Sequence, residues 1–231
     1  MRALAEVLWT PRGDRRLPGE RTLGPAIDSL SPEDVWWVAE STSAGPVYLM
    51  PTKEWLRALL AFIDAQAVHS VLEVAAGDGF LSACLAKARP GLQVRATDNH
   101  AWARLSGRLS PAEAKRGVGI GLSGIRIPDT VERLSATAAI TRYRPDLVLV
   151  SWAPPGLLVE RAIRAPSKLV LDLSVEGDVC GNDARTWRFR KELLGGPLEE
   201  RAYCRLDGRG RPRQTRATLY YGARHRLHGL E

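Results

Sequence analysis

VLEVAAGDGFLS, at residues 71–82, is an apolar run that stops at two glycines, Gly77 and Gly79, before a helical pattern resumes. The pattern predicts a buried strand, a tight turn and the first turn of a helix. Glycine suits such a turn because it bends the backbone at little steric cost and keeps side chains away from a nearby ligand. The stretch therefore predicts a nucleotide-like ligand at the end of a buried strand.

An acidic residue follows at the spacing that is typical of nucleotide-binding folds. Asp98, nineteen residues after Gly79, closes the apolar stretch 92–97 and is followed by Asn99. An acid about 20 positions past the glycine turn, at the tip of the neighbouring strand, accepts hydrogen bonds from ribose hydroxyls. We therefore expect Asp98 at the ribose. An ordinary buried strand and turn is the alternative interpretation of these segments.

The charges near the glycine turn distinguish between the possible nucleotide ligands. A dinucleotide loop carries Gly or Ala at the sixth position of G-x-G-x-x-G, where this sequence has Ser82. Asp78 lies inside the turn and would repel a pyrophosphate. S-adenosylmethionine has no phosphate and carries a sulfonium and an ammonium, which Glu73 and Asp78 complement. The charges therefore favour S-adenosylmethionine as the cofactor.

The same residues resemble a known motif. Residues 73–79 are similar to the first motif of class I S-adenosylmethionine-dependent methyltransferases, acidic-x-Gly-x-Gly-x-Gly, with Ala75 where the first glycine of that family is commonest. In that family a strand-tip acid binds the ribose, and a residue at the tip of the third strand contacts the adenine amino group. The resemblance implies these cofactor-binding residues: Glu73, Ala75, Gly77, Asp78, Gly79, Asp98, Asn99, Ser135 and Ser151.

The remaining apolar segments predict the fold class. Strands at 130–134, 145–151 and 168–174 alternate with helical patterns, which is typical of a doubly wound α/β sheet. The segments 200–206 and 215–221 are predicted to form the antiparallel C-terminal hairpin of such a fold. The expected architecture is a mostly parallel, seven-stranded, Rossmann-like sheet.

The chain is divided into a central domain with two appended segments. We expect residues 1–47 to form an N-terminal extension with a short helix and a candidate lid. Residues 1–30 are expected to be irregular or loosely docked, because they are rich in Arg, Pro and Gly. Residues 48–222 are expected to form the methyltransferase domain, and residues 223–231 a basic tail. A glycine-rich loop is predicted at 117–124.

Two helices are predicted beside the strands. Thr52 is expected to cap a helix that runs to about Gln66 and carries an apolar stripe. In class I methyltransferases the loop before such a helix folds over the cofactor, which makes Tyr48 a candidate lid residue, although a packed connector is equally consistent with the sequence. A further helix is predicted from about Ala101.

The acceptor site is predicted at the end of the fourth strand, in the sequence SWAPPG at residues 151–156. Paired prolines fix the chain and leave carbonyls free, and Trp152 supplies a flat apolar wall. The stretch resembles the Pro-Pro motif of amino-directed methyltransferases, but Ala153 replaces the side-chain acceptor and Gly156 the aromatic residue. A rigid turn with a core tryptophan is the alternative. The predicted substrate-binding residues are Tyr48, Trp152, Pro154 and Pro155.

Catalytic groups are predicted at the same edge of the sheet. Ser151 and Trp152 end the fourth strand, and Glu176 follows the fifth, where it is the first candidate base and Asp178 the second. Methyl transfer from a sulfonium needs a base only if the acceptor must lose a proton. No metal is predicted, because the histidines near the C-terminus have no second pair of ligands nearby in the sequence.

Composition restricts the class of protein. The chain has 231 residues, 45% of them hydrophobic, and no apolar run near the ~18 residues of a membrane span. Its three cysteines are widely spaced and lack a C-x-x-C pair. We therefore expect reduced thiols and a cytoplasmic protein, with no membrane partner.

The basic residues are concentrated at the C-terminus. The net charge is +7, and eight arginines lie in residues 201–231. Such a face attracts RNA or an anionic partner, or is merely solvated. We predict a small-molecule or peptide acceptor, because the basic face lacks lysine. The alternatives are a nucleic-acid methyltransferase and a non-catalytic module that binds adenosine or protein.

Overall fold

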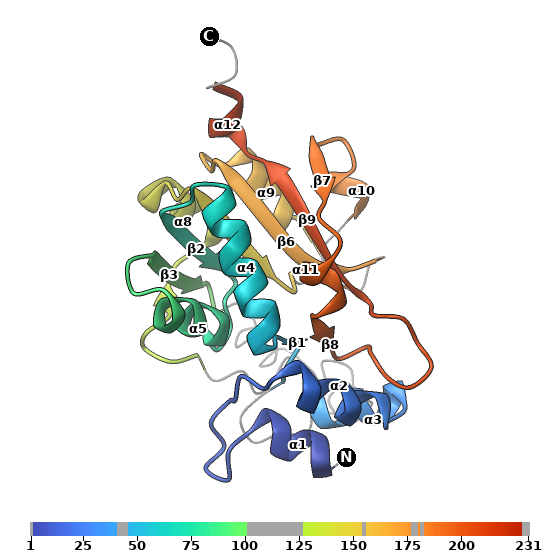
Figure 1. Ribbon diagram of the computed structural model, residues 1–231. Helices are drawn as coiled ribbons and strands as arrows, with labels where there is room; N and C mark the ends of the chain where they lie inside the picture. Colours follow the sequence, from blue (N-terminus) through green and yellow to red (C-terminus); the bar gives the residue numbers. More distant parts are fainter. Residues whose placement is uncertain are drawn as a thin grey trace, which may run out of the picture.

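The structure is a computed structural model that describes residues 2–40, 46–100, 127–153, 156–176, 180 and 183–227. The predicted helix from about Ala101 and the loop at 117–124 lie outside these residues. Figure 1 shows the arrangement of the elements. The helices are α1 (Arg2–Leu8), α2 (Glu20–Asp28), α3 (Pro32–Glu40), α4 (Lys53–Ala65), α5 (Phe80–Ala88), α8 (Ala136–Tyr143), α9 (Leu158–Arg164), α10 (Asp183–Thr186), α11 (Pro197–Glu200) and α12 (Ala223–Leu227).

A seven-stranded sheet runs through the molecule in the order β4-β3-β2-β5-β6-β9-β7. The strands from β4 to β6 are parallel, and β9 is antiparallel to both of its neighbours. The strands are β1 (Leu49–Met50), β2 (Ser70–Val74), β3 (Gln93–Asp98), β4 (Glu132–Arg133), β5 (Leu147–Ser151), β6 (Leu169–Val175), β7 (Lys191–Leu193), β8 (Tyr203–Cys204) and β9 (Thr215–Tyr221). The expected doubly wound, mostly parallel sheet is confirmed.

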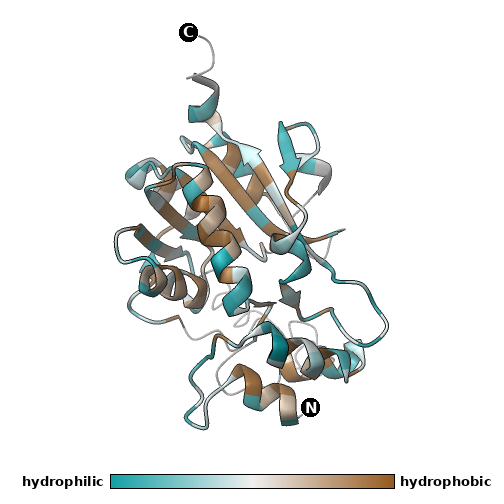
Figure 2. Cartoon of the chain, in the orientation of Figure 1, coloured by the Kyte–Doolittle hydropathy of each residue, from teal (hydrophilic) through white to brown (hydrophobic). Residues whose placement is uncertain are grey.

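Helices cover both faces of the sheet. One apolar core lies between the sheet and α4, α5 and α11, and a second lies between the sheet and α8 and α9. The central strands β5 and β6 are buried along almost their whole length. Strand β6 is accordingly hydrophobic over most of its length (Figure 2), as a parallel strand covered on both faces requires.

Helix α4 begins where the sequence predicts it. The Thr52 side chain accepts a hydrogen bond from the Trp55 amide at 3.0 Å and so caps the helix. Trp55, Leu59 and Ile63 form a buried stripe, and Trp55 Nε1 donates to the carbonyl of Leu198 at 2.9 Å. This contact ties α4 to α11.

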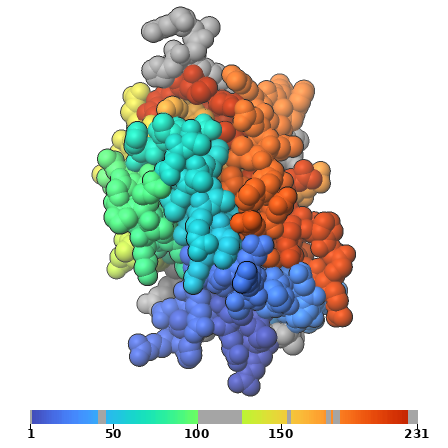
Figure 3. Space-filling view, in the orientation of Figure 1, coloured from blue at the N-terminus to red at the C-terminus, as the bar shows by residue number. Residues whose placement is uncertain are grey.

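The N-terminal residues differ from the expectation of irregular structure. Helices α1 and α2 lie within residues 1–30 and pack with α3 around Leu4, Leu23 and Ile27, which are fully buried. Leu23 and Ile27 are four residues apart and therefore share one face of α2, although Pro25 and a glycine-containing sequence obscure this pattern. The space-filling view shows the N-terminal segment, in blue, packed directly against the rest of the molecule (Figure 3).

The prediction for the C-terminal hairpin is wrong in one of its two strands. Strand β9 pairs with β6 and β7, whereas β8, within the segment that was expected to join it, pairs with β1 in a separate two-stranded sheet. Tyr203 of β8 is buried in the core of the N-terminal helices, which removes this segment from the large sheet. The buried Asp207 then accepts hydrogen bonds from the amides of Cys204 and Gln214 and so holds the connection to β9.

The third parallel strand is shorter than predicted. It is reduced to Glu132–Arg133, paired with the end of β3, and α8 follows directly with Ser135 as its cap.

Within the described ranges, no helix combines the length and the apolar character that crossing a membrane requires.

Candidate functional site

Three strand tips meet at one edge of the sheet. Val74 of β2 pairs with Thr97 of β3 on one side and with Val150 of β5 on the other. The next residues along these strands, Asp98 and Ser151, therefore flank Ala75 across the edge. The strand order reverses between β2 and β5, which is where open α/β sheets bind ligands.

The loop between β2 and α5 has the left-handed backbone that its glycines predict. Gly77 and Gly79 have φ angles of 55° and 67°. A Cβ atom at Gly79 would lie 2.6 Å from Val131 Cγ2, so both the backbone angle and the space require glycine there. The loop approaches the neighbouring strands closely, and the Ala76 and Gly77 amides donate to Thr97 and Asp98 at the edge of the sheet.

Ala75 lies where the acidic-x-Gly-x-Gly-x-Gly motif has its first glycine, and its backbone conformation is one that favours glycine. Its φ angle is 52°, in the left-handed region that a Cβ atom disfavours. The backbone therefore keeps the conformation that the missing glycine would adopt, at a cost of about 1 kcal/mol.

Asp98 holds the glycine loop against β3. Its side chain is buried, with Oδ2 accepting from the Gly77 amide at 3.1 Å and Oδ1 from the His100 amide at 2.7 Å. A carboxylate can accept more hydrogen bonds than these. Asp98 is thus fixed in position with lone pairs remaining, as a ribose-binding acid needs to be.

Glu73 is buried beneath the loop. Its Oε2 accepts hydrogen bonds from the Ser82 amide at 3.0 Å and from Ser82 Oγ at 2.6 Å. Burial raises the pKa of Glu73 to about 7, although the hydrogen bonds from Ser82 lower it. The carboxyl group therefore anchors the first turn of α5 to β2, and near neutral pH part of it is uncharged.

Asp78 has a partner that the sequence analysis missed. Arg15, between α1 and α2, lies beside it, with 2.9 Å between Nη1 and Asp78 Oδ2. The other oxygen of Asp78 accepts from the Phe80 amide at 3.0 Å. No local pattern in the sequence could have revealed this pair, because its members lie far apart in the chain.

Trp152 leaves β5 in a strained conformation. Its φ angle is 58°, and its amide donates to the carbonyl of Leu173 at 2.8 Å. The indole is half-buried against the apolar cluster of Val175, Cys180 and Cys204. Strain of this kind, worth about 1–3 kcal/mol, is concentrated at functional sites. Pro154 and Pro155 lie outside the described residues.

Tyr48 is brought to Trp152, although the two are distant in sequence. Their rings stack with centroids 6.0 Å apart. The Arg205 guanidinium lies on Tyr48, 4.7 Å from the ring centroid, and on Trp36, 3.6 Å from it. Arg205 also forms a buried ion pair with Glu40. Burial lowers the pKa of Arg205 to about 10 and raises that of Tyr48 to about 12, so both keep their usual protonation at neutral pH.

Three other candidates lie at the periphery of this edge. Glu176 is exposed and pairs with Arg216, whose Nη2 lies 2.6 Å from Glu176 Oε2. Ser135 is exposed and caps α8 by accepting from the Ala138 amide at 3.4 Å. Asn99 is exposed directly after Asp98. The second candidate base, Asp178, lies outside the described residues.

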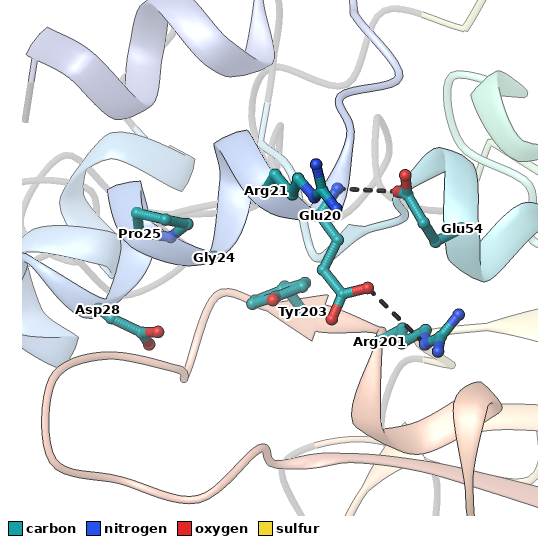
Figure 4. A pocket seen from close by; sticks show the side chains of 8 residues that line it. All are labelled: Glu20, Arg21, Gly24, Pro25, Asp28, Glu54, Arg201 and Tyr203. Carbon is teal, nitrogen blue, oxygen red and sulfur yellow. Dashed lines mark hydrogen bonds and ion pairs between the residues drawn. The ribbon is translucent and has the colours of Figure 1, made fainter.

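A groove of about 720 Å³ lies away from the glycine loop, between α2, α4 and the chain around β8 (Figure 4). In it Glu20 extends toward Arg201, 3.7 Å away, while its amide donates to Glu54 at 2.8 Å. The lining residues are Glu20, Arg21, Gly24, Pro25, Asp28, Glu54, Arg201 and Tyr203. Asp28, which also lines the groove, pairs with Arg213. Across the described ranges, no group of three or more His, Cys, Asp or Glu side chains is placed to hold a metal.

No protein-family model and no curated protein matches the sequence. Solved structures similar to the chain include the S-adenosylmethionine-dependent methyltransferase SibL in its apo form, at 17% identity and a TM-score of 0.42, with 72% of this chain and 54% of that one covered. The methyltransferase domain of a bacterial CtHen1 matches at 14% identity and a TM-score of 0.40, with 73% and 98% covered. TrmN from Thermus thermophilus matches at 20% identity and a TM-score of 0.39, with 72% and 48% covered. The matched region thus spans about half the length of SibL and of TrmN.

Proposed function

We propose that the chain binds S-adenosylmethionine at the tips of β2, β3 and β5 and transfers its methyl group to a small-molecule or peptide acceptor. One observation carries the proposal: Asp98, the glycine loop and Ser151 lie side by side where the strand order reverses. An acid held by a loop amide, beside a tight glycine turn with left-handed backbone, suits a ribose and its attached amino-acid chain.

The cofactor roles follow from this arrangement. Asp98 accepts hydrogen bonds from the ribose hydroxyls, with Asn99 beside it, and Gly77 and Gly79 allow the ligand to approach the backbone. Ser135 faces the adenine. Ala75 and Ser151 border the centre of the proposed cofactor site, Asp78 meets the amino-acid end, and Glu73 supports the loop from below. The bound cofactor supplies a methyl group on an already activated sulfonium.

The acceptor side is formed by Trp152 and Tyr48, with Pro154 and Pro155 completing the wall and Ser151 at its base. Stacked rings exclude water and orient an apolar or planar acceptor, which favours methyl transfer by positioning. Glu176 takes a proton where the acceptor must lose one. Its carboxylate is positioned by the ion pair with Arg216.

The charges of the C-terminal stretch support this acceptor class over nucleic acid. Arg205, Arg213 and Arg216 each pair with a carboxylate, from Glu40, Asp28 and Glu176 respectively. Arg224 donates to the backbone carbonyls of Arg144 and Pro145. Arginines committed in this way contribute little to a phosphate-binding face.

Transfer of a tritiated methyl group from the labelled cofactor into fractionated cell extract tests the function. We expect label in small molecules or peptides; label in the RNA fraction instead would favour the nucleic-acid alternative. Calorimetry tests cofactor binding directly. S-adenosylhomocysteine should bind more tightly than NAD, and Asp98→Ala should weaken its binding by about 1.5–3 kcal/mol. Tighter binding of NAD would contradict the proposal.

A further inference from the structure

Arg15 contacts the glycine loop, α5 and β1 at the same time. Its Nη1 donates to Asp78 Oδ2 at 2.9 Å, and its Nη2 donates to the carbonyl of Leu49 at 3.2 Å. The guanidinium carbon lies 4.1 Å from the centroid of the Phe80 ring. Only 16% of the side chain is exposed. The segment between α1 and α2 therefore places a fixed guanidinium at the ligand edge of the sheet.

This guanidinium changes the charge of the loop. The edge carries the acids Glu73, Asp78 and Asp98, of which Glu73 is buried and bound to Ser82. Arg15 adds a positive charge in contact with Asp78. The loop thus presents a negative and a positive group side by side.

Such a pair complements the free end of an α-amino acid. An ammonium needs an acceptor, and a carboxylate is matched by the planar N–H groups of a guanidinium. Arg15 has further N–H groups beyond the two that bind Asp78 and Leu49, and Asp78 has lone pairs beyond those that accept from Arg15 and Phe80. Neither residue is saturated by these contacts.

We propose that Arg15 binds the α-carboxylate of the amino-acid end of the cofactor, while Asp78 holds the adjacent ammonium. The inference rests on the proposed function and adds a residue from outside the sheet to the cofactor site. It makes the segment between α1 and α2 a wall of that site. A purely structural link between this segment and the loop would explain the contacts of Arg15, but it would confer no selectivity for a carboxylate.

The unmodified protein provides the first test. Calorimetry would compare S-adenosylmethionine with decarboxylated S-adenosylmethionine, which keeps the adenosine, the sulfonium and the amine. We expect the intact cofactor to bind about tenfold more tightly or better, because a charge-assisted pair is lost without the carboxylate. Equal affinities would overturn the role of Arg15 while leaving the proposed function standing. Binding of neither compound would overturn both.

Variants then assign the selectivity to Arg15. Arg15→Gln should weaken binding of the intact cofactor and leave the decarboxylated compound unchanged, so that the ratio of the two affinities falls to about one. Arg16→Gln alters the neighbouring exposed arginine and should keep the ratio of the unmodified protein. Equal weakening of both compounds by Arg15→Gln would mean that the residue only supports the loop, and would overturn the proposal.

A conservative variant covers the case in which Arg15→Gln fails to fold. Arg15→Lys keeps the charge beside Asp78 but lacks the planar pair of donors. It should retain an intermediate ratio, between those of the unmodified protein and of a protein without selectivity. A ratio identical to that of the unmodified protein would contradict a guanidinium–carboxylate contact.

Discussion

Tyr48 and Trp152 stack with their ring planes inclined by only 26°. Tyr48 leads into β1 and Trp152 leaves β5, so the stack joins the small sheet to the ligand edge of the large one. Arg205 extends the contact from Tyr48 to Trp36 of α3. Helix α3 therefore supports the proposed acceptor wall through a continuous row of planar groups.

The first prediction concerns this stack. Trp152→Ala should lower the free energy of unfolding by about 1–3 kcal/mol, because a half-buried indole loses its contacts with Tyr48 and the apolar cluster. It should also abolish methyl transfer. Trp187→Ala removes an indole that is 65% exposed and should change stability by less than about 0.5 kcal/mol. Urea denaturation and a transfer assay measure the two effects. Full activity of Trp152→Ala would remove Trp152 from the acceptor site.

The second prediction concerns Ala75. Ala75→Gly should stabilise the protein by up to about 1 kcal/mol, because glycine adopts a φ of 52° without a Cβ penalty. Ala83→Gly, at an exposed position inside α5, should instead destabilise by about 1 kcal/mol. Opposite shifts in the denaturation midpoint are expected. Destabilisation by both substitutions would mean that the backbone at Ala75 is not strained.

The third prediction separates backbone strain from steric overlap. Gly79→Ala introduces both, since its Cβ would meet Val131, whereas Gly210→Ala has a φ of 76° and nothing within 4 Å of the new atom. Gly210→Ala should cost about 1 kcal/mol from strain alone, and Gly79→Ala should cost more and also weaken cofactor binding. Thermal denaturation and calorimetry report the two quantities. Equal losses of stability in the two variants would show that the Val131 side chain moves aside at no energetic cost.

The fourth prediction concerns pH. The pKa of Glu73 rises from 4.5 to about 7 on folding, mainly through burial. The folded state therefore retains a proton that the unfolded state releases between these values, and stability falls as pH rises from about 4.5 to about 7. Over this pH range the free energy of unfolding falls by about 3 kcal/mol at most.

Glu73→Gln tests this dependence because it keeps an oxygen for the Ser82 amide and does not titrate. Unfolding free energies at pH 5 and pH 8 would be compared in the two proteins. The decrease should be larger in the unmodified protein than in Glu73→Gln. An identical decrease in both would mean that Glu73 titrates normally.

The sequence predicts the parallel part of the sheet well because its signals are local. The strand, the turn and the helix of residues 70–88 follow from an apolar run and two glycines, and Thr52 marks the start of α4. The N-terminal helices and the partner of β9 depend on contacts with distant residues. Tyr203 could be assigned to the large sheet from its local pattern, but burial among α1, α2 and α3 decides its place.

In the candidate site, too, local signals in the sequence were predictive and contacts between distant residues were not. Asp98 is predicted as a site residue from its spacing from the glycines, and the structure places it in hydrogen-bond contact with the Gly77 amide. From the sequence alone the Asp78 carboxylate has no evident partner, whereas in the structure Arg15 compensates its charge. Selection against a pyrophosphate by Asp78 is therefore weaker than the sequence indicates. An arginine in a stretch rich in Arg, Pro and Gly gives no local sign of such a role.

The burial of Tyr203 among the N-terminal helices has a consequence for synthesis of the protein. Leu4, Leu23 and Ile27 are synthesised well before Tyr203, which completes their core. At roughly 5–20 residues per second, this interval is about ten seconds or longer. During that time the apolar side chains of the first helices lack one wall of their core. The rate of translation thus sets how long the nascent chain is open to aggregation.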